Sequence, residues 1–211
     1  MPQRLKLVVQ NLGQRYGDLV LFRDVNFAVG NGQALVVTGD NGSGKSTLLR
    51  TLAGLMAPAL GTVRLDGLDA DEVMAEHCHL VSFANALKPE MTATETLVHW
   101  RDILGGGNKG PTVPEALNML GMSALAATPA GILSTGLKRR LALARILVAP
   151  RPLWLLDEPT AALDLASSRL VADMIRAHLK AGGLAVIATH LDLDINGVDA
   201  LNLDTFASPR V

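Results

Sequence analysis

One glycine-rich segment constrains the fold of this chain more than any other feature. It fits the phosphate-loop pattern without a mismatch. Its residues are Gly39, Asp40, Asn41, Gly42, Ser43, Gly44, Lys45 and Ser46. The apolar run Ala34–Thr38 precedes it, and leucines at helical spacing follow it. A strand, a loop and a helix in this order predict a parallel α/β core that carries a phosphate-binding loop.

The motif also predicts how a nucleotide is held. Glycines let backbone N–H groups curl around phosphate oxygens, and the helix N-terminus favours negative charge there. We expect Lys45 to reach the β- and γ-phosphates, the Ser46 hydroxyl to bind Mg²⁺, and Thr47 to join the nucleotide site. An ordinary glycine turn is the alternative, but the strand–loop–helix context favours ATP and Mg²⁺.

Two adjacent acids follow a second apolar run. Leu153–Leu156 reads as a strand that ends at Asp157 and Glu158. Burying acids is costly unless a positive charge compensates them, so Asp157 is assigned to Mg²⁺. Strand alternation points Glu158 the other way, where it is expected to polarise the attacking water. Alone, such a pair would more often be a solvated turn.

Composition narrows the function classes. A length of 211 residues suits one domain, with or without an inserted subdomain. A net charge of −1 argues against a nucleic-acid binder with a broad basic surface. The single Cys78 cannot form an internal disulfide. No signal-like stretch opens the chain, and no uncharged apolar run approaches the ~18–20 residues that span a bilayer. We therefore expect a cytoplasmic chain, with any membrane part in another chain.

The rest of the pattern surrounds a helical insertion. Strand-like runs at 5–9 and 19–27 are separated by turn glycines, among them Gly13 and Gly17. Residues 88–131 show helical periodicity, broken at 105–107. The insertion is expected to hold helices at 94–104 and 114–120. The α/β pattern then resumes, with helices at 139–148 and 166–181 and strands at 153–156 and 184–189.

Further segments resemble one superfamily. Leu133–Gly136 resembles the LSGG-type signature of ATP-binding-cassette ATPases, and Ala161–Asp164 resembles their D-loop. His190 lies where that family has its switch histidine, and Tyr16 where it has an aromatic that stacks on adenine. Nearly the whole chain takes part in this resemblance.

The resemblance implies a fold and a domain plan. The fold is α/β, a phosphate-loop core of the ATP-binding-cassette type, with an N-terminal antiparallel β subdomain and an inserted α-helical subdomain. Residues 1–211 would form a single ATP-binding domain. Its core would comprise about 1–85 and 138–211, and the helical subdomain about 86–137, carrying the signature.

The resemblance also implies a shared ATP site. Two copies would form a head-to-tail homodimer, in which Ser134 and Gly136 contact the γ-phosphate of the opposite copy. His190 would bond the γ-phosphate within its own copy, and Asp164 would tie the copies together. Less specific alternatives stay open: Tyr16 as a packing residue and His190 as a structural one.

A narrower resemblance concerns three phrases, at 87–97, 137–145 and 152–159. They are similar to the haem exporter ATP-binding family of c-type cytochrome biogenesis. The implied partners are integral membrane transporter subunits, with this chain peripheral on the cytoplasmic face of the inner membrane. Haem or a haem chaperone would be handled by the complex rather than bound by this chain. Other interpretations are a drug, lipid or peptide exporter, a soluble cassette ATPase, and a regulatory module without turnover.

One segment departs from the family pattern, and another contains possible metal ligands. Ala84 falls where the family has a glutamine that touches Mg²⁺, so either Asn85 substitutes or the contact is missing. We expect hydrolysis to survive and coupling to the partner to change; the alternative is that this loop tolerates variation and nothing changes. His77, Cys78 and His79 could ligate iron, but an extended segment would turn Cys78 away from the two histidines.

Overall fold

The computed structural model describes residues 4–69, 72–82, 84–107, 109–190 and 198–207. Contacts divide the chain into two compact units. The first unit takes its residues from 1–82, 152–158 and 177–211, and the second from 83–151 and 159–176. None of the described helices is both long and apolar enough to cross a membrane.

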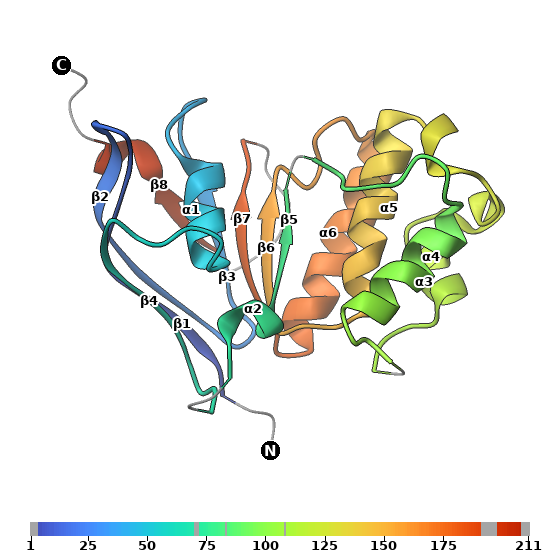
Figure 1. Ribbon diagram of the computed structural model, residues 1–211, viewed down its shortest axis with the longest axis horizontal. Helices are drawn as coiled ribbons and strands as arrows, with labels where there is room; N and C mark the ends of the chain where they lie inside the picture. The colour runs from blue at the N-terminus through green and yellow to red at the C-terminus, as the bar shows by residue number, and fades with distance from the viewer. Residues whose placement is uncertain (1–3, 70–71, 83, 108, 191–197, 208–211) are drawn as a thin grey trace. The chain divides into compact units, whose positions relative to one another are not determined.

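A five-stranded parallel sheet forms the centre of the first unit. Its order is β5 (Cys78–Val81), β6 (Leu153–Asp157), β7 (Leu184–Ala188), β3 (Ala34–Thr38) and β8 (Asp199–Asn202). Every residue of β6 and β7 is buried, as expected for central strands of a parallel sheet. Helix α1 (Lys45–Leu52) contacts both of these strands (Figure 1).

A three-stranded antiparallel sheet completes the first unit. It has the order β2 (Leu19–Gly30), β1 (Lys6–Tyr16) and β4 (Leu60–Asp66). The turn predicted at Gly13 is wrong, because Gly13 lies inside β1 opposite Leu60. A Cβ there would lie 3.2 Å from the Leu60 side chain, so close packing explains this glycine. Its neighbour Gly17 does lie in the β1–β2 turn.

The extended segment expected at the histidine–cysteine–histidine run is also partly wrong. The short helix α2 (Met74–His77) ends at His77, and β5 begins at Cys78. His77 Nε2 lies 3.2 Å from the Glu72 carboxylate, whereas Cys78 and His79 are buried. His77 therefore pairs with an acid, whereas Cys78 packs in the hydrophobic core.

The second unit is helical. It contains α3 (Ala93–Ile103), α4 (Val113–Met119), α5 (Thr135–Val148) and α6 (Leu165–Lys180), although α6 continues into the residues of the first unit. Helices α3 and α4 both pack on α5. Short 3₁₀ turns, η1 (Ser123–Leu125) and η2 (Ala130–Ile132), lead towards α5.

Local signals explain where two of these helices begin. Thr92 caps α3 and Thr112 caps α4, each in a reciprocal capping box with the glutamate three residues later. Between the two helices, the glycines predicted to break the pattern stand in the connecting loop. The predicted α/β fold, with an antiparallel sheet and a helical part, is confirmed.

Candidate ATP site

The phosphate loop joins β3 to α1 in conformations that require glycine. Gly39, Gly42 and Gly44 have φ angles of 142°, 86° and 101°, a region that L side chains rarely adopt. A Cβ at Gly44 would lie 3.1 Å from a ring carbon of Phe22, whose side chain is fully buried. Both backbone conformation and space therefore exclude larger residues from the turn into α1.

Lys45 lies at the junction of the loop and the helix. Its Nζ donates hydrogen bonds to the carbonyl oxygens of Gly39 at 2.6 Å and Asp40 at 3.0 Å. The residue is only 8% exposed, although it carries an ammonium group. Unpaired N–H groups at the start of α1 add partial positive charge beside it. This end of the loop is therefore suited to an anion.

The loop and the two predicted acids line one hollow of the first unit. Its lining residues are Leu21, Asn41, Gly42, Gly44, Lys45, Ser46, Thr47, Asp157 and Glu158. The Ser46 hydroxyl and the Asp157 carboxylate supply the oxygen ligands that Mg²⁺ prefers. Leu21 is the lining residue that the sequence patterns missed, since it reads only as one apolar position in a strand.

The side chain of Glu158 lines this hollow, but its backbone does not continue the strand as predicted. Strand β6 ends at Asp157, and Glu158 has a φ of +47°, so strand alternation no longer applies to it. Its backbone N–H donates to the carbonyl of Ala188 at 2.8 Å, which holds the strained residue in place. Such left-handed strain costs about 1–3 kcal/mol and often marks functional sites. Both acids consequently face the same hollow.

His190 follows β7 and lies near Glu158, the candidate general base. Its Nε2 is 3.7 Å from Glu158 Oε1, close enough for an ion pair when the ring is protonated. The His190 side chain is 46% exposed and that of Glu158 is 22% exposed. The ring is therefore not packed in the core, and its role as the switch histidine stays a prediction.

Tyr16 ends β1, in the first unit. Its side chain is 80% exposed, which excludes the alternative that it simply packs in the core. It is not among the residues that line the phosphate hollow, whereas Leu21 on the adjacent strand β2 is. The exposed ring, at the β1–β2 turn, is available for stacking. Its adenine-binding role stays a prediction.

The signature residues begin α5, in the second unit. Exposed Ser134 is the N-cap, and its Oγ accepts the N–H of Leu137 at 3.3 Å. A Cβ at Gly136 would lie 3.0 Å from the carbonyl oxygen of Ala162. Glycine at this position therefore lets the signature approach the D-loop closely.

Asp164 caps the next helix of this unit. Its Oδ1 accepts the N–H of Ser167 at 2.7 Å, at the start of α6. Hydrogen bonds from the Ser167 side chain and backbone, with a smaller effect of the Arg140 charge, hold the pKa of the Asp164 carboxyl below its usual value. The carboxylate is thus kept ionised and fixed in direction.

Asn85 makes a contact that bears on the missing glutamine. Ala84 is exposed, and Ala86 has a φ of +50°. Between them, Asn85 Oδ1 accepts a hydrogen bond from Nη1 of Arg139 at 3.3 Å. Arg139 is 3% exposed and lies on the signature helix α5. Asn85 is therefore engaged within the second unit.

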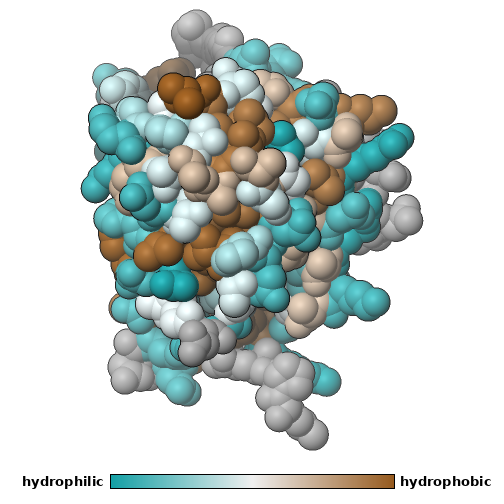
Figure 2. Space-filling view, turned by 90° about the vertical axis from the view of Figure 1, so that its right-hand side faces the viewer, coloured by the Kyte–Doolittle hydropathy of each residue, from teal (hydrophilic) through white to brown (hydrophobic). Residues whose placement is uncertain are grey.

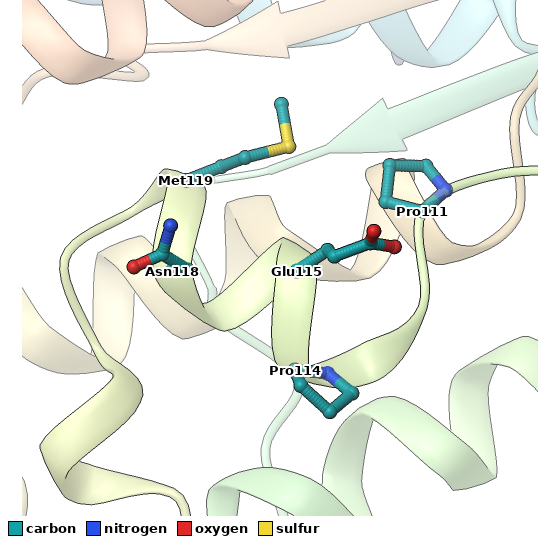
Figure 3. A pocket seen from close by; sticks show the side chains of 5 residues that line it. All are labelled: Pro111, Pro114, Glu115, Asn118 and Met119. Atoms are coloured by element: carbon teal, nitrogen blue, oxygen red, sulfur yellow. The ribbon is translucent and has the colours of Figure 1, made fainter.

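A larger hollow lies on the second unit, with a volume of about 700 Å³ against about 260 Å³ at the phosphate loop. It is lined by Pro111, Pro114, Glu115, Asn118 and Met119 (Figure 3). Among its described lining residues the one acid is Glu115, which already accepts the N–H of Thr112 at 2.8 Å in the helix cap. Because its described lining residues include neither a nucleophile nor a cation, the catalytic chemistry is not assigned to this hollow. On the face drawn in Figure 2, apolar side chains are interspersed with polar ones.

Comparisons with known proteins agree with this geometry. A family model described as ABC transporter matches residues 22–161, a stretch that contains the phosphate loop, the signature and both acids. The cytochrome c biogenesis ATP-binding export protein CcmA of Agrobacterium fabrum is 43% identical over 96% of this chain and 97% of its own length. The protein of the same name from Rhizobium meliloti is 46% identical over 96% of this chain and 99% of its own.

Solved structures share the fold. A putative ABC transporter ATP-binding protein from Pyrococcus furiosus matches with a TM-score of 0.82 at 23% identity, over 96% of this chain and 100% of that one. A bacterial Atm1-family ABC exporter with ATP bound matches with a TM-score of 0.81 at 25% identity, over 97% of this chain and 38% of that one. The resemblance predicted from the sequence is confirmed: this chain belongs to the ABC transporter family, in the group of cytochrome c biogenesis ATP-binding export proteins.

Proposed function

We propose that this chain binds MgATP at the phosphate loop and hydrolyses it as the ATPase subunit of an export complex for c-type cytochrome biogenesis. One observation carries the proposal. Lys45, Ser46 and the two acids at the end of β6 line a single hollow. That combination of a cation, a hydroxyl and two carboxylates is what transfer of a phosphoryl group to water requires.

The residues fit a bound metal–nucleotide. Ser43 has a buried hydroxyl without a hydrogen-bond partner among the described residues, which is costly unless a ligand such as a phosphate oxygen pairs with it. Ser46 and Asp157 would hold Mg²⁺, since both offer oxygen ligands in the same hollow. When bound, the ion supplies positive charge that neutralises the phosphates.

Four side chains of the chain have separate roles in binding and hydrolysis. Lys45 binds and orients the phosphates as a point charge. Glu158 orients the attacking water and accepts its proton, because its carboxylate is held towards the hollow by the left-handed turn. His190, 3.7 Å from that carboxylate, limits its orientations and offers a donor to the γ-phosphate. Tyr16 stacks on the adenine with its exposed ring.

A second copy would complete the site in a head-to-tail homodimer. Ser134 stands exposed at the N-terminus of the 14-residue α5, where the helix dipole favours a phosphate. Gly136 keeps the signature against the D-loop, and Asp164 is held ionised at the start of α6. These features support contact between signature and γ-phosphate across the dimer.

Phosphate release from MgATP tests the catalytic assignment. Glu158→Gln should lower turnover at least about 100-fold, because general-base catalysis contributes 10²–10⁴-fold, while ATP binding changes little. The matched control is Glu76→Gln, at an exposed acid on α2, which should keep wild-type turnover. Wild-type turnover in Glu158→Gln would refute the assignment.

The partner and the location have a separate test. The relatives are named as export proteins of cytochrome c biogenesis, so integral membrane subunits are the proposed partners, with this chain peripheral on the inner face of the membrane. The chain should co-purify with these subunits from native membranes. Recovery of the chain without any integral subunit would contradict this part of the proposal.

A further inference from the structure

Asp204 contacts the phosphate loop although 164 residues separate it from the loop along the chain. Its carboxylate oxygens accept the backbone N–H of Asp40 at 2.9 and 3.2 Å. Both residues belong to the first unit. The sequence patterns gave no reason to include Asp204 in the site.

The fold brings Asp204 to this position through strand pairing. Strand β8 runs parallel to β3, with Asn202 opposite Thr38, the last residue before the loop. The turn η3 (Leu203–Phe206) follows at once, and the Asn202 side chain accepts the N–H of Asp204 at 3.0 Å. The pairing of β8 with β3 and the capped turn η3 therefore position the Asp204 carboxylate at the start of the loop.

Glycine at position 39 makes the approach possible. Gly39 has a φ of 142°, and a Cβ there would lie 3.2 Å from Asp204 Oδ1 and 2.8 Å from Ser43 Oγ. Any other residue would crowd both the carboxylate and the loop. The close contact is thus built into the loop sequence.

The contact continues to Lys45 through one peptide group. The N–H of Asp40 and the carbonyl of Gly39 belong to the same peptide bond. The N–H donates to the Asp204 carboxylate, and the carbonyl accepts from Lys45 Nζ at 2.6 Å. Hydrogen bonds in such a chain polarise one another, and those that involve charged groups are the strong ones.

We propose that Asp204 is a positioning residue for ATP binding, which sets the Gly39–Asp40 peptide so that its carbonyl holds the ammonium of Lys45. This inference rests on the proposed ATP site. Asp204 is not among the residues that line the phosphate hollow, so it acts on the nucleotide through the peptide and Lys45. Its carboxylate, rather than a general loosening of the C-terminal segment, carries the effect.

Equilibrium titration of the purified full chain with MgATP tests the inference. Asp204→Ala should raise Kd about tenfold, which matches the loss of a hydrogen bond to a charged group. Asp204→Asn keeps one acceptor without the charge and should give a smaller increase. Because the peptide is held in both the ground and the transition state, kcat at saturating ATP should stay within about twofold.

Two further variants separate positioning from loosening. Thr205→Val removes the 2.7 Å bond from Thr205 Oγ1 to the carbonyl of Asn202 and loosens η3, but leaves the carboxylate in place, so it should keep wild-type affinity. In a Lys45→Met background, Asp204→Ala should lose its effect, because the residue through which it acts is gone.

The outcomes are distinct. A tenfold loss for Asp204→Ala that disappears with Lys45→Met supports the inference. Wild-type affinity in Asp204→Ala, an equal loss in Thr205→Val, or the same tenfold loss in both Lys45 backgrounds would overturn it. If the wild-type chain itself bound no MgATP, the proposed function would fail, and the inference with it.

Discussion

The stability of this protein should fall in mild acid because of His178. Its ring stacks on Trp154, with centroids 3.7 Å apart and an interplanar angle of 5°. Its Nε2 lies 3.1 Å from the carbonyl oxygen of Pro152 and 3.2 Å from that of Leu184. A Cβ at Gly183 would overlap the ring, so the backbone closes over it.

Burial therefore lowers the pKa of His178 from 6.5 to about 4, although the hydrogen bonds to Leu184 and Pro152 act in the opposite direction. Below pH 6.5 the histidine of the unfolded chain binds a proton, whereas the buried native ring stays neutral. The contribution of His178 to the free energy of unfolding is therefore fully present above pH 6.5. It falls as the pH drops from there towards the native pKa of about 4. One pKa unit corresponds to about 1.4 kcal/mol, so the free energy of unfolding should drop by about 2 kcal/mol between pH 7 and pH 5.

Urea unfolding of wild type and His178→Phe, at several pH values over that range, measures the effect. Phenylalanine keeps an aromatic ring beside Trp154 but cannot titrate. The variant should be less stable at pH 7, because the two carbonyl contacts are lost. Its drop in the free energy of unfolding between pH 7 and pH 5 should be about 2 kcal/mol smaller than that of wild type. Equal slopes in the two proteins, or a flat wild-type profile, would refute the reasoning.

Two substitutions test the phosphate loop and the missing glutamine. Gly44→Ala should lower stability by about 2–4 kcal/mol and weaken ATP binding more than tenfold, because it combines left-handed strain with contact on Phe22. The control is Gly54→Ala: Gly54 also has a positive φ, +75°, but open space around it, so this variant should lose only the stability that the backbone strain costs. An equal loss of stability in both variants would contradict the steric argument. Ala84→Gln should change partner-stimulated ATPase at least twofold and leave basal turnover unchanged; identical stimulation would remove the proposed importance of this position.

The local part of the site could be predicted from the sequence. The run Ala34–Thr38 forms β3 with the predicted bounds, because a short apolar run that contains Val36 and Val37 and ends at a glycine loop leaves few alternatives. The acids at the end of β6 were also found, since a buried strand that ends in two carboxylates is unusual. In each case, the chemistry and its structural context lie within about ten residues of sequence.

The remainder depends on tertiary structure. Glu158 was expected to alternate with Asp157, but its left-handed φ is set by the bond to Ala188 in the neighbouring strand. Asp204 reaches the loop only because β8 pairs with β3. Gly13 reads as a turn residue until its close contact with Leu60 is known. Contacts between segments far apart in sequence leave no periodic signal.

Calorimetric titration of the isolated chain with MgATP tests most directly whether the phosphate loop binds the nucleotide. We predict saturable binding of one ATP per chain below millimolar concentration, with affinity at least tenfold weaker in Lys45→Ala. If the wild-type chain did not bind MgATP at millimolar concentration, or if Lys45→Ala bound it as well as wild type, the phosphate loop could not be the ATP site of this protein.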